Sequence, residues 1–369
     1  MSEECPSRSQ ISVLVVDDSA FMRTAISRMI SSDPDLLVVG TASDGADALG
    51  KVATLNPDVV TLDVEMPGLN GLDTLRCIMA QFPRPVIMVS SATLEGAEMT
   101  LSALGAGAFD YVPKQLSSTS LDIVHIRLDL IAKIKAGAQS RLHRLAFVAE
   151  RKPPSAQPST EHDAFPIVPA IVAIGTSTGG PKALQEILPL FPNDLSVPIL
   201  IVQHMPPGFT APFAHRLNGL CSVPVHEAAN HEVVQPGVIY IAPAGTHMML
   251  ENLGGSRVAL SLTHELANSL HVPSVDIMMQ SVATAFRSSA MGVILTGMGC
   301  DGLIGMKAIH DQGGFTVGQD EASCAVYGMP RACAESGILR RVLPLAQIPA
   351  LIVQATRPRK RAVTAGSSR

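Results

Sequence analysis

The chain has 369 residues, with 27 basic against 32 acidic side chains and a formal net charge of −5. This length predicts two domains, and the acidic balance and lack of tryptophan argue against nucleic-acid binding. Six cysteines without a CxxC pair are typical of reduced thiols in a cytoplasmic protein. Strand-length apolar runs and an N-terminus without a signal-peptide core predict a protein that is not membrane-embedded.

Residues 10–135 alternate between short apolar runs and helical patterns. The runs are ISVLVVDD, LLVVGTA, PDVVTLDV, PVIMVSS and AFDYVPK. The helical patterns fall at roughly 19–31, 44–54, 71–81, 95–104 and 119–136. This alternation predicts an α/β domain with a doubly wound, five-stranded parallel sheet.

Polar residues end four of these five runs. Asp17 and Asp18 follow the first, Asp63 the third, Ser90 the fourth and Lys114 the fifth. Helix capping would explain each residue separately, but not the ordered set. Carboxyl ends of parallel strands meet at one sheet edge, so the carboxylates should converge and hold Mg²⁺. The set predicts a phosphoryl-acceptor pocket in which Asp63 is the carboxylate nucleophile and Lys114 contacts the phosphate.

On these residues, with Asp63 inside TLDVEMPGLNG, residues 10–135 resemble a response-regulator receiver domain. The resemblance implies a histidine kinase as phosphodonor, with Asp63 as the phosphorylated residue. It also implies that the Glu65 backbone joins Asp17, Asp18 and Asp63 around the Mg²⁺. Ser90, Tyr111 and Lys114 would form the receiver switch. Gln115 follows the lysine where receivers usually have proline.

Two segments are expected to lie outside compact structure. Residues 136–168 contain RKPPSAQPSTEHDAFPIVP and predict a semi-extended linker, because prolines and polar residues replace the periodic pattern. Residues 357–369 carry a cluster of Arg and Lys and predict a basic disordered tail.

Residues 169–356 repeat the alternation and predict a second, larger doubly wound α/β domain with a parallel sheet. Strands are expected at 170–175, 197–203, 237–242 and 291–296. Helices are expected at 181–190, 209–219, 274–287 and 301–311. Shorter strands near 223–227, 247–251 and 257–262 suggest an antiparallel hairpin edge.

The segment IVAIGTSTGGP places Ser177 between a buried strand and a helix that starts near Pro181. A serine there can act as a nucleophile, whereas a glycine-rich turn can also bind an anion through its backbone. The P-loop lysine and the GxSxG spacing are both missing. This segment alone leaves both interpretations open.

A serine nucleophile needs a base and an orienting carboxylate. ILIVQHMPPGFT ends a strand at His204, and VILTGMGCDGLIGM carries Asp301 in a glycine-rich turn whose N–H groups suit an oxyanion hole. Separately, His204 fits a structural histidine and Asp301 a helix N-cap. No HExxH motif supports a metal site. Cys300 is a rival nucleophile, although a small buried thiol more often fills space.

Together, GTSTGG, QHMPPGFT, HVPSVD and LTGMGCDG resemble the catalytic domain of the chemotaxis protein-glutamate methylesterases. The resemblance implies a catalytic triad of Ser177, His204 and Asp301 that needs no cofactor. The backbone at Met298 and near Thr178 would hold the oxyanion.

The same resemblance implies the substrate and the control of this site. The enzyme would demethylate glutamates on methyl-accepting chemotaxis receptors, release methanol, and deamidate selected glutamines. An unphosphorylated receiver would cover the site, and phosphorylation would open it. Thr176, Val272 and Cys300 depart from the family pattern.

Three other functions compete with this hypothesis. A DNA-binding response regulator would need a short basic output domain, which the second half of the chain does not resemble. A non-catalytic, phospho-regulated binding protein built on the esterase fold is a second alternative. An esterase module of a non-chemotaxis chemosensory pathway is the third.

Overall fold

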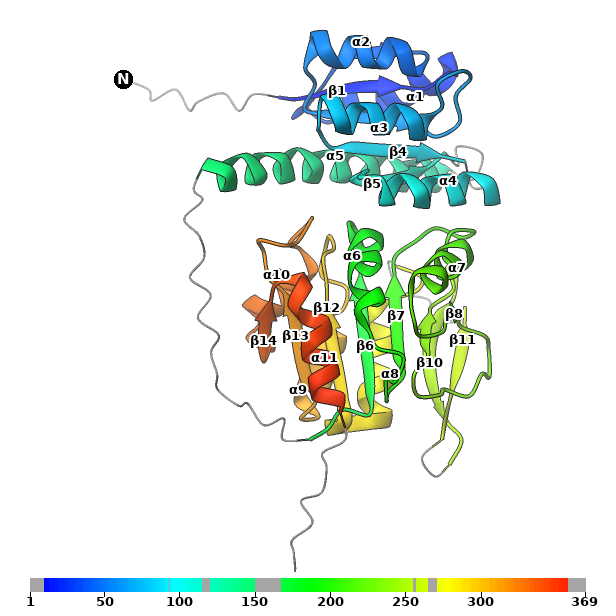
Figure 1. Cartoon of the computed structure of the whole chain (residues 1–369), viewed down its shortest axis with the longest axis vertical. Coiled ribbons are helices and arrows are strands. Elements are labelled where there is room, and N and C mark those ends of the chain that lie inside the picture. The colour runs from blue at the N-terminus through cyan, green and yellow to red at the C-terminus, as the bar shows by residue number, and fades with distance from the viewer. Residues whose placement is uncertain are drawn as a thin grey trace, which may run out of the picture.

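The structure is a computed structural model that describes residues 10–91, 93–114, 120–149, 167–254, 257–264 and 271–357. Gln115, residues 150–166 of the expected linker and residues 358–369 of the expected tail lie outside this description. The described residues form two α/β domains, one above the other in Figure 1.

The N-terminal domain contains a five-stranded parallel sheet in the order β2-β1-β3-β4-β5. Its strands are β1 (Ile11–Val16), β2 (Leu36–Ala42), β3 (Val59–Asp63), β4 (Val86–Ser90) and β5 (Asp110–Pro113). Its helices are α1 (Ala20–Ser31), α2 (Gly45–Leu55), α3 (Gly71–Gln81), α4 (Leu94–Gly105) and α5 (Ser120–Ala149). One apolar core packs α1 and α5 against the sheet, and a second packs the other three helices, which confirms the predicted doubly wound domain.

Helix α5 is longer than the sequence pattern predicted. It runs to Ala149, so the expectation of a semi-extended linker from residue 136 is wrong for residues 136–149. The physical reason is composition, because AGAQSRLHRLAFVA consists largely of good helix formers, and the first proline comes only at Pro153.

The C-terminal domain is larger, and its sheet has seven parallel strands in the order β14-β13-β12-β6-β7-β9-β8. These are β6 (Ile171–Thr176), β7 (Ile199–Gln203), β8 (Val225–Glu227), β9 (Ile239–Ile241), β12 (Ala290–Ile294), β13 (Phe315–Gln319) and β14 (Arg341–Leu343). The helices are α6 (Gly180–Ile187), α7 (Thr210–Leu220), α8 (Val275–Phe286), α9 (Leu303–Asp311), α10 (Met329–Glu335) and α11 (Ile348–Thr356). One apolar core packs α6, α7 and α11 on one face of the sheet, and another packs α8, α9 and α10 on the opposite face.

The predicted hairpin is correct for two of its three strands. β10 (His247–Asn252) and β11 (Val258–Thr263) pair antiparallel, whereas β8 pairs parallel with β9 at the edge of the main sheet. Val225 is buried and β8 packs against α7, so burial on the main sheet decides where this short strand pairs.

The N-terminal domain covers one edge of the C-terminal sheet. In Figure 1, α5 crosses between the domains and α4 lies above α6 and α7. The ring of Tyr111 stacks on that of Phe209 with centroids 4.8 Å apart. This contact belongs to an apolar cluster that continues from the N-terminal domain into the C-terminal domain. Among the described residues, no helix combines the length and apolar character needed to span a bilayer.

Candidate functional site

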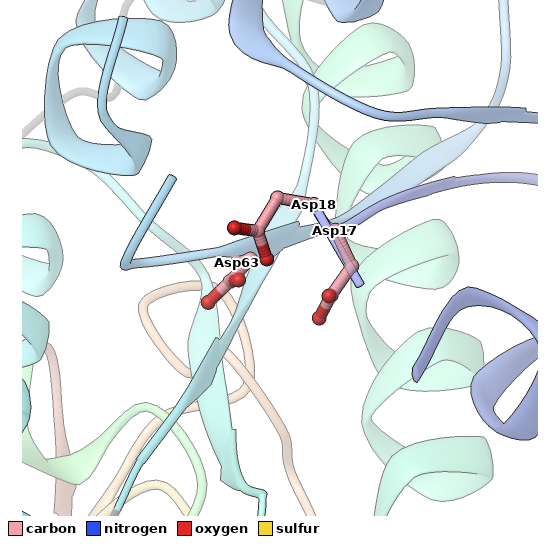
Figure 2. A group of neighbouring side chains, drawn as sticks. All are labelled: Asp17, Asp18 and Asp63. Atoms are coloured by element: carbon pink, nitrogen blue, oxygen red, sulfur yellow. The ribbon is translucent and has the colours of Figure 1, made fainter. Parts of the chain in front are cut away.

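Three carboxylates converge at the carboxyl edge of the N-terminal sheet (Figure 2). Asp17 and Asp18 follow β1 and Asp63 ends β3, and one oxygen of each lies within 4.8 Å of the others. Asp17 and Asp63 are buried, whereas Asp18 is exposed. Clustered carboxylate oxygens with one side open to solvent fit a hard divalent cation such as Mg²⁺ that keeps water ligands.

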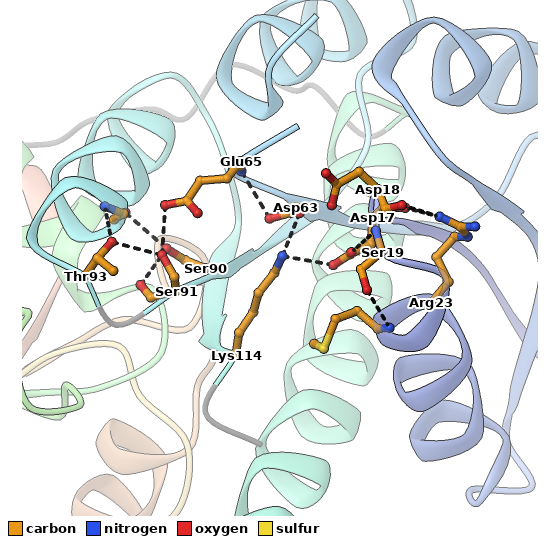
Figure 3. A network of polar contacts seen from close by, with 12 residues as sticks. Asp17, Asp18, Ser19, Arg23, Asp63, Glu65, Ser90, Ser91, Thr93 and Lys114 are labelled. Carbon is orange, nitrogen blue, oxygen red and sulfur yellow. Dashed lines mark hydrogen bonds and ion pairs between the residues drawn. The ribbon is translucent and has the colours of Figure 1, made fainter. Parts of the chain in front are cut away.

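Lys114 reaches into this cluster from the end of β5 (Figure 3). Its Nζ lies 2.6 Å from Asp63 Oδ2 and 3.1 Å from Asp17 Oδ2. Burial raises the pKa of Asp63 to about 6; Lys114 opposes this rise, and the charge of Asp17 adds to it. The pocket therefore holds a buried carboxylate whose negative charge Lys114 compensates only in part.

Capping does not account for these acidic residues, because other residues cap the helices. Ser19, Asp44, Asn70 and Thr93 each accept a hydrogen bond from a backbone N–H in the first turn of their helix. The structure brings together the residues predicted from the strand ends. The hydroxyl of one of them points away from the carboxylates.

That hydroxyl belongs to Ser90, which ends β4 and is buried. Its Oγ donates to the carbonyl of Gly96 at 3.1 Å and so faces the first turn of α4. Ser91, which sequence reasoning missed, donates to Glu65 Oε1 at 2.8 Å, and the Glu65 N–H donates to Asp63 Oδ1 at 3.1 Å. The β4–α4 loop is thus connected to Asp63 through Glu65 (Figure 3).

In the C-terminal domain, Ser177 and His204 follow two paired strands. Thr176 ends β6 opposite Gln203 at the end of β7, so the next residue of each strand enters the same space. Ser177 and His204 line one cavity of about 320 Å³. Thr176 is buried and its Oγ1 donates to the Thr296 carbonyl at 2.8 Å, which gives a structural reason for a hydroxyl at this position.

Asp301 is the partner of His204, and His204 Nε2 lies 2.8 Å from Asp301 Oδ2. Burial favours the neutral acid, but the hydrogen bond and charge of His204 and backbone N–H groups of α8 hold the pKa of Asp301 well below its usual range. The carboxylate accepts four further hydrogen bonds, from Ser274 Oγ and from the N–H groups of Val275, Asp276 and Gly302. The expected N-cap role at α9 is thus replaced by contacts to the first turn of α8.

The imidazole of His204 is held on its second side as well. His271 stacks on it with ring centroids 4.1 Å apart and planes 17° apart. Burial and the charge of His204 lower the pKa of His271, which favours a neutral stacking partner. Nδ1 of His204 is buried and has no hydrogen-bond partner among the described residues, so this nitrogen is left to accept a proton.

The glycine-rich turn after β12 lies against Ser177. A Cβ placed on Gly297 would be 3.0 Å from Ser177 Cβ, so the backbone at Gly297 packs against the serine. Met298 is the next residue of the chain after this contact. Thr178 is buried and lines the same cavity as Ser177. Cys300 is exposed, which corrects the expectation of a buried filler, because the loop before α9 turns this side chain outward.

The N-terminal domain reaches this cavity through residues that sequence reasoning missed. Asp110 and Lys133 line it together with Ser177. Asp110 Oδ2 accepts a hydrogen bond from the N–H of Gly179 at 3.2 Å. Gly179 has a φ of 76°, in the left-handed region that favours glycine, just before α6. Lys133 Nζ lies 3.7 Å from Asp110 Oδ1 and 2.9 Å from Asp129 Oδ2.

The electrostatics of this contact follow from burial. Burial raises the pKa of Asp110, and Lys133 opposes the rise. Burial alone would lower the pKa of Lys133, but the carboxylates of Asp110 and Asp129 raise it. A partly buried lysine and a buried carboxylate of the N-terminal domain thus line the same cavity as Ser177.

Comparison with known proteins shows the family of both domains. Residues 172–352 match the family model described as CheB methylesterase, and residues 13–124 match that of the response regulator receiver domain. The chain is 45% identical over 362 residues to a protein-glutamate methylesterase/protein-glutamine glutaminase of Nitratidesulfovibrio vulgaris, covering 93% of this chain and 98% of the relative. The chain belongs to this family.

Other relatives and solved structures cover the same two parts. A Pyrococcus abyssi protein with the same name is 45% identical over 94% of each chain. The crystal structure of the Thermotoga maritima CheB methylesterase catalytic domain is 39% identical with a TM-score of 0.49, covering 51% of this chain and 99% of that chain. The response regulator domain of Thermotoga maritima CheB is 48% identical with a TM-score of 0.33, covering 35% of this chain and 97% of that chain.

Family membership shows a hydrolase with a methylesterase domain behind a response-regulator receiver domain. The predicted architecture and enzyme class are therefore confirmed.

Proposed function

We propose that this protein hydrolyses glutamate methyl esters on methyl-accepting chemotaxis receptors in the cytoplasm. Ser177 would be the nucleophile, His204 the general base and Asp301 the orienting carboxylate. The observation that carries the proposal is the 2.8 Å contact between His204 and Asp301 beside a serine in the same cavity. The names of the relatives, protein-glutamate methylesterase/protein-glutamine glutaminase, support the substrate class.

The chemistry is acyl transfer to serine. His204 Nδ1 takes the proton of Ser177 Oγ as the oxygen attacks the ester carbonyl, and the same proton then leaves with the methoxy group as methanol. Water next attacks the acyl-enzyme with His204 as base, which frees the glutamate carboxylate and restores the serine. Asp301 stays ionised throughout, in keeping with its lowered pKa. The same steps would deamidate glutamine, with ammonia as the leaving group.

We assign the oxyanion to the backbone N–H groups of Met298 and Thr178. The assignment is supported by the contact of Gly297 with Ser177 and by the place of Thr178 in the cavity wall. Preorganised N–H donors stabilise the negative charge that develops on the carbonyl oxygen in the transition state.

In the receiver domain, Asp63 would accept a phosphoryl group from a histidine kinase. Asp17, Asp18, Asp63 and the Glu65 backbone would hold Mg²⁺, which when bound neutralises charge on the phosphoryl oxygens. The close carboxylate cluster supports this set. Lys114 would then contact the phosphate, which draws it away from Asp63.

Phosphorylation would control access to Ser177. Lys114 directly follows the strand, β5, that carries Asp110 and Tyr111 to the domain interface, so a change at Asp63 has a short path to that interface. In the expected switch, Ser90 and Tyr111 rearrange with Lys114, and the population shifts towards an arrangement in which the cavity is open.

The test is incubation of the purified protein with membranes that carry methyl-labelled receptors, with and without acetyl phosphate. We expect methanol release that increases with the phosphodonor. A folded, phosphorylated protein that releases no methanol would contradict the proposed substrate.

A further inference from the structure

Gln203, the last residue of β7, lies between the loop of the nucleophile and the loop of the base. Its side chain is 1% exposed. Its Nε2 donates to the carbonyl of Ser177 at 2.9 Å and to the carbonyl of His204 at 3.0 Å. We infer that Gln203 is a positioning residue that fixes the distance between nucleophile and base, an inference that rests on the proposed roles of Ser177 and His204.

The backbone explains why a side chain is needed here. The β6–β7 register ends at the pair Thr176–Gln203, and the His204 N–H donates to the Thr176 carbonyl at 3.2 Å. Beyond this point the two strands separate into their loops. The side-chain amide of Gln203 continues the connection for one further residue on each side.

The chemistry of the contact selects a primary amide. One nitrogen of the Gln203 side chain carries two N–H donors, and two carbonyl oxygens face it. A glutamate carboxylate has the same shape but would place acceptors against acceptors. An asparagine has the same donors on a side chain that is one methylene shorter.

The other end of the amide is fixed by packing. A Cβ placed on Gly180 would lie 2.0 Å from Gln203 Oε1, so the oxygen sits against the backbone at the start of α6. This oxygen is buried and has no hydrogen-bond partner among the described residues. A buried acceptor without a partner costs stability. We therefore attribute the presence of glutamine at position 203 to its two donor contacts, with the carbonyls of Ser177 and His204, and not to a gain in stability.

The test compares Gln203→Glu and Gln203→Asn with Gln319→Glu, each in the full-length chain treated with acetyl phosphate. Gln319 is the matched control, because it is also a buried glutamine at the end of a strand of the same sheet, β13, which β12 and β6 separate from β7. Its Oε1 accepts from the Thr296 N–H, and its Nε2 donates to Ser323. Glutamate at 319 keeps the acceptor for the Thr296 N–H and, like glutamate at 203, replaces a donor that faces a carbonyl oxygen with an acceptor.

We expect kcat for methanol release to fall about 100-fold in both Gln203 variants, because a displacement of about 1 Å between reacting groups has an effect of this size. KM should stay within about twofold. The rate of fluorophosphonate labelling at Ser177 should fall with kcat, while the final labelled fraction stays equal to that of the wild type. Gln319→Glu should lose less than about fivefold in kcat.

Two outcomes would overturn the inference. One is a kcat within about threefold of wild type in folded Gln203→Asn. The other is a loss of labelled fraction at an unchanged labelling rate, which indicates a structural role. Fluorophosphonate labelling needs no receptor. Wild-type protein that is labelled but releases no methanol would therefore refute the proposed substrate. The labelling rates of the variants would still test the role of Gln203.

Discussion

Two aspartates at the carboxyl edges of the two sheets have opposite electrostatic environments. Burial raises the pKa of Asp63 to about 6, whereas the pKa of Asp301 is held well below its usual range despite burial. Both lie at the edge of a parallel sheet where α/β proteins place their functional groups.

The difference lies in the number of donors around each carboxylate. Asp63 accepts from the Glu65 N–H, pairs with Lys114, and faces the charge of Asp17. Asp301 accepts from four donors in addition to His204, two of them N–H groups at the start of α8. The carboxylate proposed to accept a phosphoryl group, Asp63, has few compensating groups, whereas Asp301, which contacts the imidazole of His204, has many.

The largest expected effect is at Ser177, the proposed nucleophile. Ser177→Ala should lower methanol release about 10⁶-fold, as removal of the nucleophile does in other serine hydrolases, and should abolish fluorophosphonate labelling. Phosphorylation of Asp63 should be unchanged, since that site is in the other domain. Labelling that persists in this variant would assign the nucleophile to another residue.

Asp301→Asn tests the saturated carboxylate directly. We expect kcat to fall about 10⁴-fold, because the amide favours the wrong imidazole tautomer and does not stabilise the imidazolium. Asp276→Asn is the matched control, because its carboxylate accepts from the Gly305 N–H and interacts with Asp301, but it does not contact His204 in the described structure. A similar loss in both variants would mean that the start of α8, rather than the charge of Asp301, matters.

The sequence alone was sufficient to predict the strands that lead to the candidate site residues, and therefore that these residues lie at one sheet edge. Ser177, His204 and Asp301 each follow a strand of one parallel sheet, and chain order with apolar periodicity places such residues at one edge. The same reasoning brought Asp17, Asp18, Asp63 and Lys114 together.

What could not be predicted depends on contacts between distant segments. The stacking of His271 on His204, and the carbonyls that accept from the Gln203 amide, involve loops whose conformation has no periodic signal in the sequence. Asp110 contacts Gly179 only because two domains dock, and one strand pattern cannot show which residues face a partner domain. By contrast, apolar and polar residues alternate in FTVGQ at β13, so the sequence does indicate this strand, which the sequence analysis missed.

The docked arrangement predicts a gain of activity in Asp110→Ala. Loss of the Gly179 contact and of the Lys133 ion pair should weaken the closed arrangement, so we expect activity of the unphosphorylated protein to rise about tenfold, equivalent to about 1.4 kcal/mol. Activity after phosphorylation should change little, because that arrangement no longer uses the contact. Both are measured as methanol release.

The control for this variant is Asp33→Ala, which removes another aspartate that pairs with α5. Asp33 pairs with Lys135 inside the receiver domain at 2.8 Å. It should leave basal activity at the wild-type value. An equal rise in both variants would show that any loss of an α5 ion pair loosens the receiver domain, and that the contact of Asp110 with Gly179 has no particular role.

The smallest expected effect concerns Asp63 and its negative charge. Because its pKa is raised in the folded protein, neutral Asp63 favours the folded state. This contribution to the free energy of unfolding is fully present below about pH 4 and is lost as the pH rises through about 6. Asp63→Asn mimics the neutral form, so in EDTA its receiver domain should match wild type near pH 4 and exceed it by about 2 kcal/mol at pH 8. Adding Mg²⁺ at pH 8 should stabilise the wild type and narrow this difference, because the cation supplies the missing positive charge. Urea unfolding followed by circular dichroism measures both, and a difference that is the same at pH 4 and pH 8 would contradict the shortage of compensating charge at Asp63.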